Sequence, residues 1–385
     1  MKHRYGINVL YVITKLELGG AQKVCLSLIK GLKEHDHNPL LITGKEGYFV
    51  KDIKNEPYVL LVDTFRREIS LKYVFQEFIN FLKIVKRIRN ITKVNDYLIV
   101  HTHSTKAGLV GRWAAFFCGV KTRIHTIHGF GFHKHQSWFK WLPIYFAELF
   151  TSFITTHYVC VSSEDVKMGL KLFPNFAKKH SIIRAAIDWE QFYTSARGEP
   201  VESIRARSQK DFIFGTVACF KEQKNLFDLL NAFKLVNHKN PKTRLEIIGD
   251  GHLRPKIEKW ISENNLENRV TLHGWQEKVA PFMQKWHVFV LSSLWEGLPC
   301  SVVEARMLKL PVISYNTGGI HDVIFDSQNG FLCPQADWQS LAQRMTEICE
   351  NQEIYTKFQV YQDDLSDFNA AKMVQEHIKL YKNLN

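Results

Sequence analysis

The sequence has little cysteine and places none of it in a recognised pairing pattern. Its seven cysteines are odd in number, are scattered between Cys25 and Cys349, and never form a C-x-x-C pair. This argues against a disulfide framework or a structural zinc site, and it favours a reducing compartment. Stability must therefore come from ordinary hydrophobic cores, which a hydrophobic share of 45% can supply.

Long apolar runs and a leader pattern are also missing. The best candidate for a membrane-spanning segment, residues 144–154, is too short and contains Glu148. The first six residues lead directly into a strand-like run, without the charged and apolar regions of a signal peptide. The sequence thus predicts a chain that works in the cytoplasm.

Acidic residues are scarce in the first half of the chain. Residues 1–200 contain 29 lysines and arginines against 16 acidic residues, whereas the rest of the chain has 22 of each. The whole net charge of +13 therefore comes from the first half. This asymmetry favours an anionic partner, either a nucleic acid or an anionic membrane surface, and the alternative is a solvated surface that only confers solubility. No RNP-type, helix-turn-helix or zinc pattern supports binding to nucleic acid.

What the sequence does contain is a repeated alternation of strand-like and helix-like runs. Short apolar runs predict strands, and a helix with a period near 3.6 is expected over 71–91. The expected strands are 7–13, 39–43, 59–62, 98–102, 123–127, 158–161, 181–183, 212–217, 245–248, 270–272, 288–291, 312–314 and 330–332. This order is typical of α/β proteins with parallel sheets. We expect two doubly wound domains, with the strand ends of both facing a central cleft.

Composition suggests where the domains end. Residues 188–210 are polar, lack periodicity and contain a glycine and a proline, which predicts a linker. The expected domains are therefore 1–187 and 211–362. The terminal segment 363–385 is expected to form a helix that packs back on the first domain.

The most informative feature is the run 295–304, which holds two carboxylates eight positions apart. An apolar strand precedes it, and Pro299 lies near the first turn of the helix that follows. Glu296 would therefore lie at the carboxyl end of a strand, where ligands bind in open α/β sheets. The helix start offers N–H groups to an anion, and Glu304, one turn further on, suits the two neighbouring hydroxyls of a ribose. The spacing fits a sugar nucleotide.

A lysine occupies a comparable place earlier in the chain. Lys224 begins a helix after the strand 212–217, where its ammonium group could neutralise a diphosphate as a point charge. Cations are not favoured at helix N-termini, so a merely structural surface lysine is the weaker alternative.

Together these features resemble the retaining glycosyltransferases of family 4, which have the GT-B fold of two Rossmann-like domains. The resemblance covers nearly the whole chain. It rests on the runs 18–22, 101–108, 127–130, 184–188, 222–225, 248–251, 295–304 and 316–319, in this order. The His-Gly-Phe-Gly-Phe run at 128–132 is similar to members that build bacterial surface polysaccharides.

The resemblance implies an activity. It is the transfer, with retention, of a hexose or N-acetylhexosamine from a nucleotide diphosphate, most often UDP, to a lipid-linked saccharide or similar acceptor. No Asp-x-Asp metal clamp is found, so the resemblance implies no metal and no cofactor. Surface polysaccharides such as lipopolysaccharide or capsule would be the product.

The resemblance also implies roles for individual residues. Glu296, His128 and Lys224 are expected to be catalytic, and Glu304 is expected to hold the ribose. Donor binding is further expected to involve Gly19, Gly20, Lys221, Gly249, Gly251, Gly297, Leu298, Pro299, Cys300, Ser301, Gly318 and Gly319. A tight turn is an alternative role for several of these glycines.

His103 also lies at a strand end and is followed by Ser104, Thr105 and Lys106. His103 and Lys106 are assigned to the acceptor side. In the family an arginine lies five positions before the lysine, whereas this chain has Cys219 there. Lys221 is the candidate replacement.

Basic and aromatic residues suggest a membrane surface. Five cations, Lys83, Lys86, Arg87, Arg89 and Lys93, crowd the end of the long helix, and the segment 130–150 is rich in aromatic residues. Aromatic residues mixed with lysines favour a bilayer interface, so we expect peripheral binding to the inner leaflet. The alternative is that the cations suit a helix C-terminus and the aromatics fill the domain core.

The same residues are also compatible with other functions. A sugar-nucleotide epimerase or a sugar phosphorylase would share the two-domain architecture. A non-catalytic basic module that binds nucleic acid or membrane, or an inactive scaffold marked by Cys219, are alternatives from another class.

Overall fold

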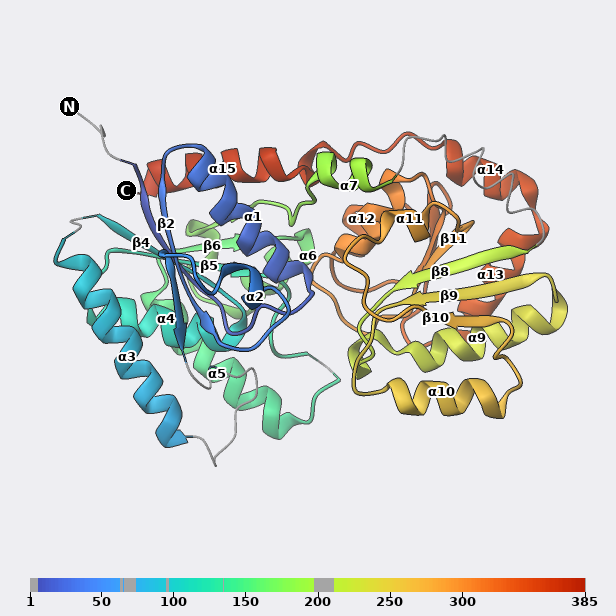
Figure 1. The fold of residues 1–385 in the computed structure, drawn as a ribbon, viewed down its shortest axis with the longest axis horizontal. Coiled ribbons are helices and arrows are strands. Elements are labelled where there is room, and N and C mark those ends of the chain that lie inside the picture. Colours follow the sequence, from blue (N-terminus) through green and yellow to red (C-terminus); the bar gives the residue numbers. More distant parts are fainter. Residues whose placement is uncertain are drawn as a thin grey trace. The chain divides into compact units, whose positions relative to one another are not determined.

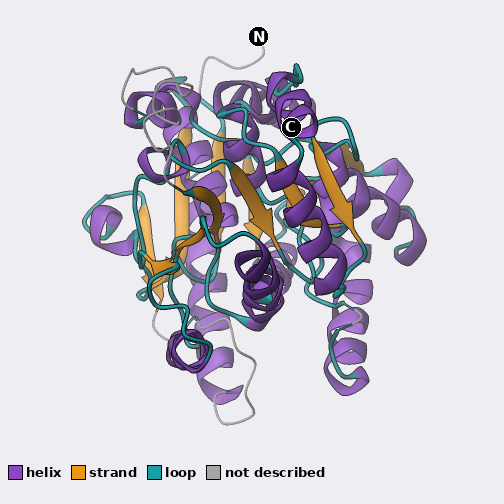
Figure 2. Cartoon of the chain, turned by 90° about the vertical axis from the view of Figure 1, so that its right-hand side faces the viewer, coloured by secondary structure: helices purple, strands orange, loops and turns teal. Residues whose placement is uncertain are grey.

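The computed structural model describes residues 6–62, 65, 74–94, 97–133, 135–196 and 211–384, which form two units (Figure 1). Unit 1 runs to Ala186 and takes up the chain again from Asp367, and unit 2 is Ile187–Ser366. Each unit has a parallel sheet with helices packed against it, as Figure 2 illustrates. The prediction of two Rossmann-like α/β units is confirmed.

Unit 1 contains a seven-stranded parallel sheet in the order β3-β2-β1-β4-β5-β6-β7. Its strands are β1 (Asn8–Val12), β2 (Asn38–Gly44), β3 (Val59–Val62), β4 (Leu98–His103), β5 (Thr122–Ile127), β6 (His157–Cys160) and β7 (His180–Ile182). Its α-helices are α1 (Gly20–Glu34), α2 (Val50–Ile53), α3 (Val74–Thr92), α4 (Thr105–Phe117), α5 (Trp138–Ile154), α6 (Ser163–Leu172) and α15 (Ala370–Leu384). The expected start of α3 at residues 71–73 lies outside the described residues.

Alternation along the strands assigns the helices of unit 1 to the two faces of its sheet. Leu10 and Val12 of β1 belong to the core formed with α3 and α4. Tyr11, between them, points to the other face, where its hydroxyl lies 2.8 Å from that of Tyr381 in α15. The terminal helix α15 thus belongs to the core of unit 1 and packs beside α1.

Unit 2 contains a six-stranded parallel sheet in the order β10-β9-β8-β11-β12-β13. Its strands are β8 (Phe212–Val217), β9 (Thr243–Ile248), β10 (Val270–Leu272), β11 (Val288–Leu291), β12 (Val312–Tyr315) and β13 (Gly330–Cys333). Its α-helices are α7 (Trp189–Ser195), α9 (Leu226–Lys239), α10 (Arg254–Glu263), α11 (Ala280–Met283), α12 (Cys300–Met307), α13 (Trp338–Glu350) and α14 (Gln352–Val360).

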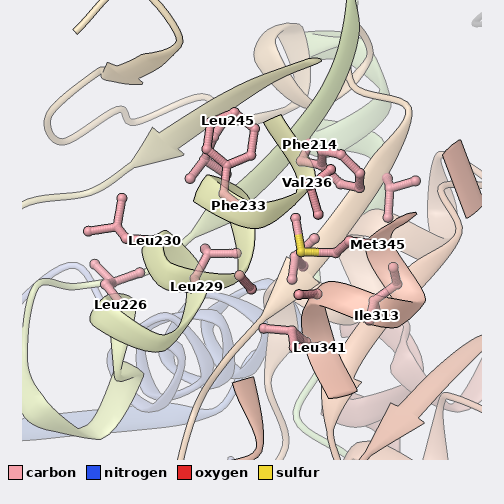
Figure 3. Close-up of a cluster of buried hydrophobic side chains, with 14 of the residues drawn as sticks. Phe214, Leu226, Leu229, Leu230, Phe233, Val236, Leu245, Ile313, Leu341 and Met345 are labelled. Atoms are coloured by element: carbon pink, nitrogen blue, oxygen red, sulfur yellow. The ribbon is translucent and has the colours of Figure 1, made fainter. Parts of the chain in front are cut away.

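The core of unit 2 forms because α9 and α13 present apolar stripes to the sheet. Leu226, Leu229, Leu230, Phe233 and Val236 of α9 recur at helical spacing and are buried. Figure 3 shows them with side chains of α13 and of strands β8, β9 and β12. This packing anchors the strands whose ends carry the site described below.

Each sheet has one point at which the strand order reverses. In unit 2, β8 and β11 are neighbours, and the chain leaves β8 toward β9 but leaves β11 toward β12. In unit 1 the same relation holds for β1 and β4. The loops that follow two such strands diverge, and this is where open α/β sheets bind ligands.

The segment expected as a linker, 188–210, begins with the helix α7 instead. The Asp188 carboxylate accepts a hydrogen bond from the Gln191 N–H (3.0 Å), which caps the helix, and Phe192 is buried. Two hydrogen bonds tie α7 to the rest of unit 2: the Tyr193 hydroxyl donates to Met307 O (3.3 Å), and the Gln284 amide donates to Ala196 O (2.9 Å). The rest of the predicted linker, 197–210, lies outside the described residues.

The expected terminal helix over 363–385 starts later than predicted. Asp363 lies in unit 2, where its carboxylate accepts from the buried Arg306 guanidinium (2.8 Å). A 3₁₀ turn, Ser366–Phe368, follows, and α15 begins at Ala370 because the Asn369 side chain accepts from the N–H of Ala371 (2.8 Å).

Among the described residues, no helix combines the length and apolarity that crossing a bilayer requires.

Candidate functional site

A lysine and a glutamate meet where the strand order of unit 2 reverses. Lys224 ends a short 3₁₀ turn, Glu222–Lys224, after β8, and Glu296 lies in the loop after β11. The Lys224 ammonium donates to Glu296 Oε1, and the two side chains are only 15% and 9% exposed. Burial lowers the pKa of Lys224, but the Glu296 carboxylate outweighs this effect, so the pKa is raised overall. The lysine is therefore charged at neutral pH.

Hydrogen bonds between the two loops fix this pair. The Gln223 amide donates to Trp295 O (2.8 Å) and to Glu296 Oε2 (3.4 Å). The Leu294 N–H donates to Gln223 O (2.8 Å), and the Ser292 hydroxyl donates to Lys224 O (2.9 Å). Both carboxylate oxygens of Glu296 thus have donors, and the two loops hold each other in place.

A third loop, after β12, packs directly under Glu296. Gly318 has a φ of +54°, and a Cβ built on it would lie 2.1 Å from Glu296 O. The Gly319 N–H donates to Gly297 O (2.6 Å), and the Thr317 hydroxyl donates to Leu294 O (3.1 Å). Gly318 therefore lets the loops approach each other closely. The expected contact of Gly318 and Gly319 with a ligand stays a prediction.

Helix α12 starts immediately after the Glu296 loop. Pro299 is the N-cap residue, in an extended conformation, and Cys300 and Ser301 open the helix. Leu298 is 8% exposed, and Glu304, one turn in, is 7% exposed. The structure thus places the expected donor-binding residues of 297–304 on one loop and one helix start, where backbone N–H groups suit an anion.

The glycines after β9 pack against the loop after β8. Gly249 has a φ of +131°, and a Cβ on it would lie 2.0 Å from Ala218 O. A Cβ on Gly251 would lie 2.6 Å from Phe220 O. Both glycines thus pack the loop after β9 against the loop after β8, which carries Cys219 and the expected donor residue Lys221, the latter just before the turn that ends at Lys224. Their observed role is this close loop packing.

In unit 1, two predicted histidines contact each other. His103 ends β4, and His128 follows β5. His103 Nδ1 lies 2.9 Å from His128 Nε2, and the ring planes are tilted by 30°. Burial lowers the pKa of His128 to about 3, with a further contribution from His377, and it lowers the pKa of His103 well below 6.5. Both imidazoles are therefore uncharged at neutral pH.

A buried polar network that sequence reasoning missed supports these histidines. His101 stacks on His103 at 4.7 Å, and its ring nitrogens lie 2.6 Å from the Tyr381 hydroxyl and 2.7 Å from the Thr126 hydroxyl. His377, one helical turn before Tyr381 on α15, lies 5.7 Å from the His101 ring. His101 belongs to the run 101–108, but its hydrogen-bond partner Tyr381 on α15 is 280 residues away in the sequence.

The other predicted residues of unit 1 lie near β1 and β4. Gly19 is the N-cap residue of α1, and Gly20 is its first residue, next to the point where the strand order reverses. Ser104, directly after His103, has a φ of +66° and a ψ of 148°, which is strained for a residue with a side chain, and its hydroxyl lies 3.2 Å from that of Thr14.

Lys106, expected on the acceptor side, is engaged within unit 1. Its ammonium donates to the Glu77 carboxylate of α3, and the lysine side chain is 10% exposed. Any acceptor contact by Lys106 would have to compete with this ion pair. The sequence alone did not predict the pair, because Glu77 comes from another helix.

In the described part of the chain, no group of three or more histidine, cysteine, aspartate or glutamate residues is arranged to hold a metal ion. This includes His133 and His135, whose rings lie 6.1 Å apart.

Comparison with known proteins identifies the chain's relatives. The family model described as Glycosyltransferase Family 4 matches residues 18–191, and that described as Glycosyl transferases group 1 matches residues 201–363. An Escherichia coli UDP-Gal:alpha-D-GlcNAc-diphosphoundecaprenol alpha-1,3-galactosyltransferase is 29% identical over 97% of this chain and 96% of its own length. The Staphylococcus aureus capsular polysaccharide biosynthesis glycosyltransferase CapM is 24% identical over 81% of each chain.

Among solved structures, Anabaena Alr3699/HepE in complex with UDP and glucose has a similar fold. The TM-score is 0.81 at 16% identity, and the match covers 98% of this chain and 99% of that one.

We expect Gly318→Ala to destabilise unit 2 strongly, because the new methyl group would collide with Glu296 O while the backbone stays left-handed. Gly274→Ala is the matched control: Gly274 also has a positive φ (+67°), but its Cβ would meet nothing closer than 3.9 Å. The free energy of unfolding should fall by at least about 2 kcal/mol more for Gly318→Ala. Equal losses in urea denaturation would contradict the close loop packing.

Unit 1 should gain stability as the pH rises from about 4 to 6.5. Unfolded histidine has a pKa of 6.5, whereas burial lowers the pKa of His128 to about 3 and of His377 to about 4. Between these values the unfolded state binds more protons than the folded state, so stability increases with pH, by up to about 1.4 kcal/mol per pH unit for each histidine.

Urea denaturation at a series of pH values measures this slope. His377→Gln should flatten it, and substitution of the exposed His238 by glutamine should leave it unchanged. A slope that His377→Gln does not alter would show that this histidine is not buried in its neutral form.

Proposed function

The chain belongs to the family 4 glycosyltransferases of the GT-B fold, and from this premise we propose which reaction it performs. It transfers a hexose or N-acetylhexosamine, with retention, from a UDP-sugar to a lipid-linked saccharide during the synthesis of a bacterial surface polysaccharide. The observation that carries this proposal is the buried contact of Lys224 with Glu296, beside the start of α12 and at the point where the strand order reverses.

The contact suits a diphosphate leaving group. Lys224 is held charged among buried groups, so it is a preorganised cation that needs no reorientation when charge develops on phosphate oxygens. The backbone N–H groups at the start of α12 add a second source of positive potential. Glu296 would lie by the donor sugar, and Glu304 on α12 would accept hydrogen bonds from the ribose hydroxyls.

The neutral histidines suit the reacting sugar. An uncharged His128 can donate or accept one hydrogen bond without placing a positive charge beside an oxocarbenium-like centre. His103, in contact with His128, would hold its ring in place and border the acceptor. No enzymic nucleophile is proposed: the departing phosphate oxygen would take the proton of the acceptor hydroxyl.

The relatives support the choice of donor and acceptor. The name of the E. coli relative specifies UDP-Gal as donor and a diphosphoundecaprenol-linked sugar as acceptor. The Anabaena structure contains UDP and glucose. By analogy the acceptor of this chain is a sugar on a polyprenyl diphosphate, so the enzyme would work in the cytoplasm, peripherally attached to the inner leaflet through its basic amino-terminal half.

Three substitutions test the assignment. Lys224→Ala and Glu296→Ala should each lower kcat by about 10²-fold or more, because each removes a group that acts on the transition state. Glu304→Ala should mainly raise the KM for the donor. The assay is transfer of radiolabelled sugar from UDP-galactose or UDP-N-acetylglucosamine to a lipid-diphosphate saccharide.

The exposed Lys259→Ala, on α10, is the control and should behave as the unsubstituted protein. Near-normal rates in all three site variants would end the assignment. Incubation with the UDP-sugar alone distinguishes the rival activities of the same fold, since an epimerase would change the sugar and a transferase would release it only slowly.

We also propose that no divalent ion takes part, because Lys224 and the α12 start supply the positive charge that a metal would otherwise provide. EDTA should leave the transfer rate unchanged. A loss of turnover that added magnesium restores would refute this proposal.

A further inference from the structure

Helix α5 has aromatic residues on two sides: Trp141 and Tyr145 pack toward the core of unit 1, whereas other aromatic residues of the helix face away from the protein. Glu148, Thr151 and Ser152 are buried. The outward side chains are 38 to 68% exposed: Trp138, Phe139, Leu142, Phe146, Phe150 and Phe153. At 100° per residue these six positions occupy one face of the helix. An ordinary surface helix has polar residues on its outward face.

Buried polar contacts with α4 fix this orientation. The fully buried Arg112 guanidinium donates to the Glu148 carboxylate (2.7 Å), to Gly108 O (2.8 Å) and to the Thr155 hydroxyl (3.0 Å). The Trp113 indole N–H donates to the Thr151 hydroxyl (2.9 Å). Rolling the helix to bury its aromatic face would break these contacts and leave a buried charge without its partner, which is costly.

The apolar face continues across α4 to α3. Phe116 and Phe117 at the end of α4 are exposed, and Phe117 packs edge-on against Phe81 of α3 at 6.2 Å. Phe75, Phe78 and Leu82 of α3 are exposed as well. Helix α4 contacts both α3 and α5, and Figure 1 shows the three helices along one side of unit 1. We name the exposed aromatic and aliphatic side chains of these helices the α3–α5 face.

Cations flank this face on α3. Lys86, one turn after Leu82, and Arg89 lie on the same face of α3 as Phe78 and Leu82. The exposed Arg87 lies on the side of α3 that faces β3. A groove of about 240 Å³ between α3 and the edge strand β3 has Leu60 and Leu61 on its apolar side and Lys83, Lys86 and Arg87 on its basic side. Apolar surface next to clustered cations matches the layers of an anionic bilayer surface.

We propose that the α3–α5 face is the membrane-docking surface of this protein, with its aromatic side chains inserted among the lipids and the α3 cations at anionic head groups. A patch of this extent is rare on a protein surrounded only by water. The cations disfavour a second copy as the occupant, because the basic edges of two copies would repel each other. The proposal deepens the proposed function, on which it rests only for the choice of a bacterial inner-leaflet lipid.

Vesicle co-sedimentation of the full chain tests the proposal. Vesicles that contain phosphatidylglycerol should retain the protein, and pure phosphatidylcholine vesicles should retain it less. Phe139→Ser, Phe150→Ser and Phe153→Ser combined should weaken partitioning into the anionic vesicles by at least about tenfold. Lys86→Glu with Arg87→Glu should remove the preference for the anionic lipid.

The matched control replaces three exposed apolar residues of unit 2, Leu235, Phe325 and Val360, by serine. It should bind vesicles as the unsubstituted protein does. Because the three phenylalanines on α5 are exposed, their replacement should leave the melting temperature unchanged, which circular dichroism checks.

Insertion itself has a direct readout. Brominated phospholipid should quench part of the tryptophan fluorescence, and Trp138→Phe should abolish much of that quenching. Absence of vesicle binding, or equal binding by the triple α5 variant, overturns the proposal. The proposal is also overturned if the triple variant binds vesicles normally and differs from the unsubstituted protein only by changing from dimer to monomer in sedimentation velocity, because the face would then be an interface between two copies.

Release of sugar from the UDP-sugar in detergent-free solution needs no membrane and separates the two proposals. If this activity is absent while vesicle binding follows the expected pattern, the proposed function fails and the docking surface stands. If the unsubstituted protein releases sugar from the UDP-sugar while the triple variant still binds vesicles, the proposed docking surface is wrong and the proposed function stands.

Discussion

The contact of Lys224 with Glu296 is the interaction on which the site of unit 2 depends. Two opposite charges that are largely removed from water are stable only when each has partners, and here both carboxylate oxygens of Glu296 receive a hydrogen bond. The loops must therefore stay in register, and Gly318 allows it because only a residue without a Cβ fits beneath Glu296 O. Strand order, loop packing and charge thus act together: adjacent parallel strands bring the loops close, and the ion pair holds them.

The buried histidines of unit 1 differ from the Lys224–Glu296 pair, because they carry no charge. They contact hydroxyls and one another, and burial keeps them uncharged. A carboxylate among them would raise their pKa values, as Glu296 does for Lys224. The site of unit 2 therefore contains a fixed charge, whereas the histidines of unit 1 form an uncharged hydrogen-bonded cluster.

The sequence predicted those features that depend on short stretches of the chain. Apolar runs predicted all thirteen strands of the described residues to within two residues at either end, and the same runs placed Lys224 and Glu296 after the carboxyl ends of β8 and β11. Contacts over long separations could not be read this way: Tyr381 reaches His101 across 280 residues, and Glu77 reaches Lys106 from another helix. The start of the segment 188–210 differs from the predicted linker, because the Asp188 side chain caps a helix there despite the polar composition.

Helix α5 illustrates why composition alone misleads. Its aromatic residues were expected either in the core or at a bilayer, and periodicity cannot choose, because an amphipathic helix has the same pattern whichever face is buried. The choice lies with Arg112, a residue of another helix, because its ion pair with Glu148 holds the Glu148 side of α5 inward and leaves the opposite aromatic side exposed. With the orientation of α5 fixed in this way, the exposed aromatic side chains lie in the same half of the chain as the excess positive charge. Screened attraction acts over about 8–10 Å and the apolar contact only at the surface, so the cations of α3 would draw the protein to an anionic bilayer before the aromatic side chains engage it.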